Sequence, residues 1–228
     1  MIKMKISFSI ILQTVLFLFL LTSCGTDNYD APESLLAGKV VYNGEPVQVR
    51  GTNERVRLQL YQDGYQNYTP IEVFVTQDGS FSAKLFDGEY KMVTRDNNGP
   101  WENSRDTTYI TVRGNTVQNM EVTPYFTITN ADMKLSGKKV TATFTVNQIV
   151  TNRQIERILL LVNRTQFVDD DIRIDRIDYT GTDAKTGSLS YSFDINDEAN
   201  NAATLFGRIC VWTAGADQGI YSPVFHLK

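Results

Sequence analysis

The chain has 228 residues with 22 Lys or Arg, 26 Asp or Glu and one His, which gives a net charge of −4. This acidic balance, without a basic stripe, argues against nucleic acid as a partner, because phosphate binding needs clustered cations. The length fits two domains of ordinary size better than one.

The N-terminal segment has the pattern of an export signal. Basic residues precede an almost unbroken apolar run at residues 10–21, which is too short and wrongly flanked for a membrane span. The run closes on Leu21-Thr-Ser-Cys24, which resembles a bacterial lipobox, whose cysteine becomes the first mature residue and carries the lipid. We expect a signal peptide at residues 1–23 and a lipidated tether at 24–34. The alternative is an ordinary signal peptide with a chance cysteine.

The residues after Cys24 predict where the lipid anchor lies. Gly25 stands where an inner-membrane retention signal would place Asp, and Asp27 and Asp30 resemble the acidic export tags of surface lipoproteins. We therefore expect a protein anchored in the outer membrane and facing outward, with the periplasmic side as the alternative.

Residues 35–123 alternate apolar and polar side chains in short runs. Val56, Leu58 and Leu60 alternate with polar neighbours, and such runs are typical of half-buried strands. Turn dipeptides separate the runs, at Asn43-Gly44, Asp63-Gly64, Asp78-Gly79 and Asp87-Gly88. Because Gly, and next best Asn or Asp, tolerates the positive φ of tight hairpins, these pairs predict an antiparallel β-sandwich.

A second series of strands begins near Pro124 and is expected to fill residues 124–228. About seven short strands in a domain of this size predict an immunoglobulin- or fibronectin type III-like sandwich, without the Cys-Trp-Cys spacing of antibody domains. Cys210 lies in the apolar run 206–212 and is expected to be a small buried hydrophobe rather than a reactive thiol. The predicted fold is therefore all-β, with two sandwiches in tandem.

The order of motifs in the first series supports a family resemblance. The motifs lie at residues 36–41, 43–47, 56–58, 78–81 and 88–91. They resemble carboxypeptidase regulatory-like domains, which are transthyretin-like sandwiches. The chain from Cys24 onward resembles an uncharacterised family of outer-membrane lipoproteins that accompany Sus-type glycan-uptake systems. This resemblance implies an accessory of a TonB-dependent importer and supplies no catalytic residues.

We expect no enzymatic activity and no cofactor. A Ser-His-Asp arrangement would have to use His226, next to the C-terminus, and zinc needs more ligands than one His and one Cys supply. Paired carboxylates could hydrolyse a glycosidic bond. However, acids such as Asp78 and Asp87 lie at turns, where a backbone role accounts for them.

The sharpest acidic cluster is Asp169, Asp170 and Asp171. A hard cation such as Ca²⁺ would relieve the repulsion of three carboxylates, but the spacing differs from an EF-hand loop. A solvated acidic turn is the preferred interpretation, and calcium stays the weaker candidate.

Three loops combine aromatic with polar side chains, as a sugar-binding site requires. The candidate ligand-binding residues are Tyr65, Tyr68, Asn97, Asn98, Trp101, Asn103, Arg105, Trp212 and Tyr221. Two alternatives stay open: Trp101 could be a lid on the core, and Trp212 could extend the apolar run before it. In addition, Asp106-Thr107-Thr108 resembles an O-glycosylation acceptor, with Thr107 as the modified residue.

Two functions stay open. The first is a glycan-binding or glycan-presenting lipoprotein beside a TonB-dependent importer. The second is a scaffold of the same machinery, bound to a SusC/SusD-like importer pair and without a sugar site of its own.

Overall fold

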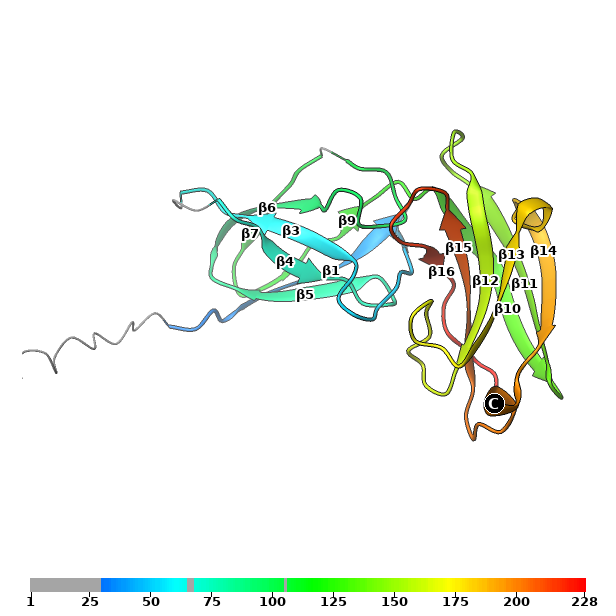
Figure 1. Cartoon of the computed structure of the whole chain (residues 1–228). Helices are drawn as coiled ribbons and strands as arrows, with labels where there is room; N and C mark the ends of the chain where they lie inside the picture. Colours follow the sequence, from blue (N-terminus) through cyan, green and yellow to red (C-terminus); the bar gives the residue numbers. More distant parts are fainter. Residues whose placement is uncertain (1–29, 65–67, 105) are drawn as a thin grey trace, which may run out of the picture. The chain divides into compact units, whose positions relative to one another are not determined.

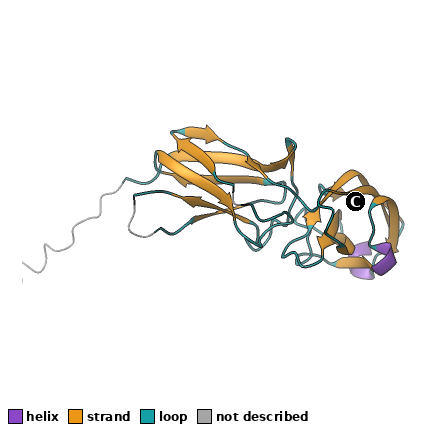
Figure 2. Ribbon diagram, turned by 90° about the horizontal axis from the view of Figure 1, so that it is seen from above, coloured by secondary structure: helices purple, strands orange, loops and turns teal. Residues whose placement is uncertain are grey.

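The computed structural model describes residues 30–64, 68–104 and 106–228, and Figure 1 traces their course. The predicted signal peptide and Cys24 lie outside these ranges. Pro32–Lys228 forms one compact unit, and its regular structure is almost entirely β-strand, as Figure 2 shows. Within the described ranges, no helix has the length and apolar character needed to cross a membrane. The predicted all-β fold is confirmed.

The first strand series folds into two sheets. The first sheet consists of β1 (Ser34–Tyr42), β2 (Glu45–Pro46), β5 (Ser80–Leu85), β8 (Asn115–Val117) and β9 (Met120–Glu121). Strand β1 pairs with all four other strands of this sheet, antiparallel with β2 and β5 and parallel with β8 and β9. The second sheet has the order β4-β3-β6-β7, from β3 (Arg57–Tyr61), β4 (Ile71–Phe74), β6 (Gly88–Thr94) and β7 (Thr108–Val112).

Period-two alternation builds the core of this sandwich. Leu36 and Val40 of the first sheet and Leu58, Leu60 and Met92 of the second are all fully buried in one cluster. Their neighbours along each strand point the other way, because successive side chains of a strand alternate between its faces. The alternation predicted from the sequence thus decides which face is core.

The turn dipeptides have two different roles. Asn43 and Gly44 both have positive φ, 51° and 80°, as the tight hairpin between β1 and β2 requires. Asp87, in contrast, acts through its side chain, because its Oδ1 accepts hydrogen bonds from the Ser34 hydroxyl and from the Gly114 N–H.

The second strand series forms another pair of sheets. One has the order β10-β11-β14, from β10 (Phe126–Ser136), β11 (Lys139–Gln148) and β14 (Gly187–Asp194). The other has the order β13-β12-β15-β16, with β17 also on β15, from β12 (Ile155–Asn163), β13 (Asp175–Thr180), β15 (Phe206–Thr213), β16 (Ile220–Tyr221) and β17 (Phe225–His226). Two short helices complete it, the 3-10 helix η1 (Gly181–Asp183) and α2 (Asp197–Asn200).

Strand β12 is buried on both faces. Ile158 and Leu160 belong to the main core, whereas Leu159 and Leu161 form a second cluster with Cys210 on the opposite face of the sheet. Cys210 is free and fully buried, and this burial raises the pKa of its thiol. The prediction that Cys210 is a small buried hydrophobe is confirmed.

Candidate functional site

The outward face of the sheet β4-β3-β6-β7 collects aromatic and polar side chains. Strand β3 buries Leu58 and Leu60 and leaves Tyr61 half-buried on the other face. Strand β7 buries Ile110, and the Tyr109 before it is 73% exposed. The alternation that fills the core therefore leaves two tyrosines on the opposite, solvent-facing side.

Strand register places Tyr61, Lys91 and Tyr109 in one row across three strands. Tyr61 of β3 pairs with Lys91 of β6, and Lys91 pairs with Tyr109 of β7. Tyr68, which follows β3 in the chain, stacks on Tyr61 with ring centroids 5.0 Å apart and is itself 54% exposed. We call these four residues the tyrosine face.

The ammonium of Lys91 is held by Asp63. Its Nζ lies 2.9 Å from Oδ1 and 2.8 Å from Oδ2 of that carboxylate. The hydrogen bond from Lys91 to Asp63 raises the pKa of the lysine, so the ammonium stays charged at neutral pH. The row thus combines aromatic rings with a surface ion pair that offers a donor and an acceptor.

Two hollows adjoin the row. The first, of about 510 Å³, is lined by Gln59, Tyr61, Val93, Thr94, Arg95, Asp96 and Ser104. The second, of about 360 Å³, is lined by Gln62, Asp63, Glu89, Tyr90, Lys91 and Tyr109. Beside the first hollow, the Gln59 amide donates to Glu72 Oε1 at 2.9 Å, and Arg95 lies 3.9 Å from Glu72 Oε2. Both hollows therefore offer polar groups next to an aromatic ring.

Among the predicted ligand-binding residues that the structure describes, Tyr68 alone belongs to the tyrosine face. Tyr65 and Arg105 lie outside the described residues. Asn97 and Asn103 cross-link their own loop: the Asn97 N–H donates to Asn103 Oδ1 at 2.8 Å, and Asn103 Nδ2 donates to Asn97 Oδ1 at 3.0 Å. Asn98 instead joins this loop to the start of β3, because its Oδ1 accepts from the Arg57 N–H at 2.8 Å. Their amides are engaged with protein groups.

Trp101 is a core residue in this structure. Its side chain is only 2% exposed, and it forms an isolated β-bridge with Pro124. The indole lies against Gly99, where an added Cβ would come within 2.2 Å of the ring. The sequence-based interpretation of Trp101 as a ligand platform therefore does not fit this conformation, and the alternative of a lid on the core does.

Trp212 and Tyr221 also pack against protein. Tyr221 is 2% exposed and donates its hydroxyl to Asp170 Oδ1 at 2.6 Å. Trp212 is half-buried beneath the Arg157 guanidinium, 4.8 Å from the ring centroid, and its Nε1 donates to the Ala216 carbonyl at 3.2 Å. Tyr221 borders a groove of about 540 Å³ together with Tyr42 and Pro223, but its ring is almost fully buried in this conformation.

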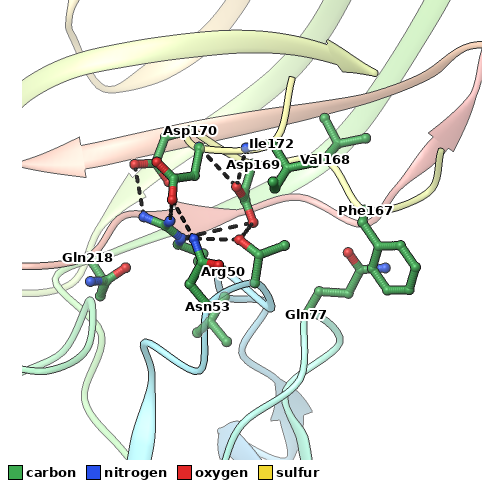
Figure 3. A network of polar contacts seen from close by, with 12 residues as sticks. Arg50, Asn53, Gln77, Phe167, Val168, Asp169, Asp170, Ile172 and Gln218 are labelled. Carbon is green, nitrogen blue, oxygen red and sulfur yellow. Dashed lines mark hydrogen bonds and ion pairs between the residues drawn. The ribbon is translucent and has the colours of Figure 1, made fainter. Parts of the chain in front are cut away.

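Arg50 pairs with the acidic cluster, whose side chains range from the buried Asp169 to the exposed Asp171. Asp169 is only 1% exposed, and its Oδ1 accepts from the N–H groups of Asp171 and Ile172 at 2.9 Å each. Arg50 reaches Asp170 at 3.3 Å and forms a further ion pair with Asp171, and Figure 3 shows Arg50 beside Asp169 and Asp170. The expected solvated turn is wrong for Asp169, because its carboxylate is buried and hydrogen-bonded.

The calcium candidate at the same cluster is not supported either. Within the described ranges, no group of three or more His, Cys, Asp or Glu side chains is placed to hold a metal ion. The guanidinium of Arg50 occupies the position in which a cation would relieve the repulsion of the three carboxylates.

Beside this cluster, Arg208 is a fully buried cation bonded to backbone carbonyls. Its Nε donates to Ser222 at 3.0 Å, Nη1 to Val49 at 3.2 Å and Val168 at 3.3 Å, and Nη2 to Gln77 at 3.2 Å. Burial lowers the pKa of Arg208 to about 10, so it is still cationic at neutral pH. Because Val49 and Gln77 come from the first strand series, this side chain ties that series to β15.

Thr107 is half-buried and lies just before β7. Its glycosylation stays a prediction.

Two family models divide the chain between them. Residues 34–123 match the model described as a protein of unknown function, DUF3823, N-terminal domain, and residues 126–226 match a domain of unknown function, DUF3823_C. The chain belongs to the DUF3823 family. The predicted association with Sus-type systems stays a prediction.

Solved DUF3823 structures share this fold over nearly their whole length. One from Parabacteroides merdae is 48% identical, with a TM-score of 0.83, and the match covers 87% of this chain and 100% of that one. One from Bacteroides ovatus is 35% identical, with a TM-score of 0.79, covering 85% and 98%. Both bear out the tandem β architecture.

A third solved structure is more distant. It is named "a putative carbohydrate binding protein" from Bacteroides uniformis and is 18% identical, with a TM-score of 0.69, covering 86% of this chain and 99% of that one. At this identity the likeness shows a common fold. No curated protein matches the chain.

Proposed function

We propose that this DUF3823 protein binds polysaccharide through the tyrosine face and does not cleave it. The observation that carries the proposal is the row of Tyr61, Lys91 and Tyr109, with Tyr68 stacked above its end. Sugar rings offer an apolar C–H face and a rim of hydroxyls, so they are bound by exposed aromatic rings flanked by fixed polar groups. The tyrosine face and the Lys91–Asp63 pair have this composition.

Two further observations support binding over cleavage. The structural relative from Bacteroides uniformis carries a carbohydrate-binding name. The carboxylates around the face also have partners: Asp63 accepts from Lys91, Glu72 from Gln59, and Glu89 from the Thr111 hydroxyl at 2.8 Å. A glycosidase needs an acid and a base or nucleophile on either side of the scissile bond, whereas these carboxylates are tied to the protein's own donors.

We expect Tyr109→Ala to weaken polysaccharide binding about tenfold or more, because the most exposed ring of the face is lost. The measurement is affinity electrophoresis and calorimetric titration against a panel of plant, host and microbial polysaccharides. Phe86→Ala is the matched control, since Phe86 is a 48% exposed aromatic of the same sandwich outside the face. If no polysaccharide binds the wild-type chain, or if both variants bind equally well, this proposal is wrong.

We further propose that Cys24 anchors the protein in the outer membrane, with the sandwiches facing outward beside a TonB-dependent importer. The support is the lipobox-like sequence that ends at Cys24. Cys24→Ala is expected to move the protein from the detergent phase to the aqueous phase in phase partitioning, because acyl chains supply the anchor. Protease shaving of intact cells tests the orientation. Wild-type protein that partitions into the aqueous phase would contradict the anchor.

A scaffold role is the second candidate, and the buried Arg208 favours it. Four hydrogen bonds from one side chain to both strand series suit a stiff spacer in a surface complex. Co-purification with a SusC/SusD-like pair, without affinity for any glycan, would support the scaffold over the binding protein.

A further inference from the structure

The tyrosine face is long enough to contact more than one sugar unit of an extended ligand. Tyr61 and Tyr109 lie two strands apart in the same register row, and neighbouring strands are about 4.8 Å apart, so the Cα atoms of the two tyrosines are separated by roughly 10 Å. This separation is about the length of a disaccharide. A single sugar ring can therefore cover one tyrosine platform at a time.

The row is also open at its outer end. In the order β4-β3-β6-β7, β7 is the terminal strand, so a ligand lying on Tyr109 can continue past the sheet edge. At the other end, β4 pairs with β3 only as far as Leu60, and Tyr61 lies beyond this pairing with Tyr68 stacked on it. This arrangement suits a chain that passes across the face.

The charges around the face are paired before any ligand arrives. Lys91 is bound by Asp63 at 2.8 Å, and Arg95 lies 3.9 Å from Glu72. An anionic polymer would have to compete with these carboxylates for each cation, and it would meet Glu89 in the second hollow. A neutral glycan can use the same groups as hydroxyl donors and acceptors without breaking an ion pair.

We infer that the tyrosine face binds an internal stretch of a neutral, linear glycan laid across β3, β6 and β7. This inference rests on the proposed function and names its ligand class. Sugar rings stack on Tyr68 at one end of the row and on Tyr109 at the other. The Lys91–Asp63 pair between them bonds the hydroxyls of the connecting unit.

The test uses the full chain, purified in detergent, and oligosaccharides of increasing length from neutral linear β-glucan, α-glucan and xylan. We expect affinity to rise with length until the oligomer spans both platforms and then to level off. Reducing the terminal sugar to an alditol should not change the affinity of long oligomers. Raising the salt concentration should change it less than about twofold, because no net charge is neutralised.

Variants separate the two platforms. Tyr68→Ala and Tyr109→Ala are each expected to lower the affinity for the longest oligomer about tenfold. Each should also abolish the dependence of affinity on oligomer length. Phe86→Ala should leave the affinity and its dependence on length unchanged. If monosaccharides bind as tightly as polymers, if end reduction abolishes binding, or if only a uronate polymer binds in a salt-sensitive way, the inference is overturned while the proposed function stands. Absence of binding to every glycan overturns both.

Discussion

Replacing Arg208 by methionine is expected to destabilise the protein by about 3–5 kcal/mol, because the neutral side chain leaves buried carbonyls without their donor. Four carbonyl oxygens, those of Val49, Gln77, Val168 and Ser222, accept from this one guanidinium. Arg208 also lies over the Tyr221 ring, 4.5 Å from its centroid. For a chain of this size, the loss corresponds to a fall of roughly 10 °C in the unfolding midpoint.

Scanning calorimetry of wild-type and variant proteins measures this shift. Arg208→Lys is the matched control: it keeps the charge, but its single ammonium cannot reach four separated carbonyls, so an intermediate midpoint is expected. A methionine variant as stable as the wild type would show that the carbonyl contacts contribute little.

Trp101→Ala is expected to cost about 3–5 kcal/mol, the usual range for removing a large aromatic from a core. Trp101 is 2% exposed, its ring lies against Gly99, and its backbone forms an isolated β-bridge with Pro124. Removal of the indole would leave a cavity in the core cluster to which Trp101 belongs. Urea unfolding followed by circular dichroism measures the loss.

Trp101→Phe distinguishes a core role from a ligand-binding role. Among the residues that the structure describes, Nε1 of Trp101 has no hydrogen-bond partner, so phenylalanine should recover most of the stability. Polysaccharide affinity should be unchanged in this variant. If it binds glycan much more weakly than the wild type while remaining as stable, Trp101 belongs to the binding site after all.

The fold could be predicted from the sequence because the patterns that specify its strands and turns lie within short segments. Alternation at Leu58 and Leu60 states directly which side of β3 faces the core, and Asn43-Gly44 marks a hairpin through the φ values that these two residues tolerate. Strand β12 departs from the simple rule, since Leu159 and Leu161 are buried as well. Segments distant in sequence bury the outer face of this sheet, so the pattern within one strand does not predict that burial.

The candidate site was harder to predict because loop composition does not decide between a ligand platform and a lid on the core. The polar, glycine-containing loop around Trp101 was compatible with both, and in the structure its asparagines cross-link the chain and its tryptophan is buried in the core. The acidic cluster at Asp169 likewise depends on Arg50, which is contributed by the first strand series. Partners that are distant in sequence decide both cases.

The tyrosine face could have been found in part. Tyr109 immediately precedes the inward Ile110, so alternation alone predicts that it points outward. That Tyr109 lies in one row with Tyr61 depends on strand register, because Lys91 of β6 pairs with both tyrosines. Strand pairing across a sheet is not determined by the period of a single strand.

The most direct measurement is a crystal structure of the protein soaked with the longest neutral linear oligosaccharide that binds it. We predict sugar rings over Tyr68 and Tyr109, with hydroxyls in hydrogen-bonding distance of Lys91 and Asp63. A different groove, of about 540 Å³, is lined in part by Tyr42, Thr127 and Pro223. Sugar density in that groove, with the tyrosine face left empty, would contradict the account.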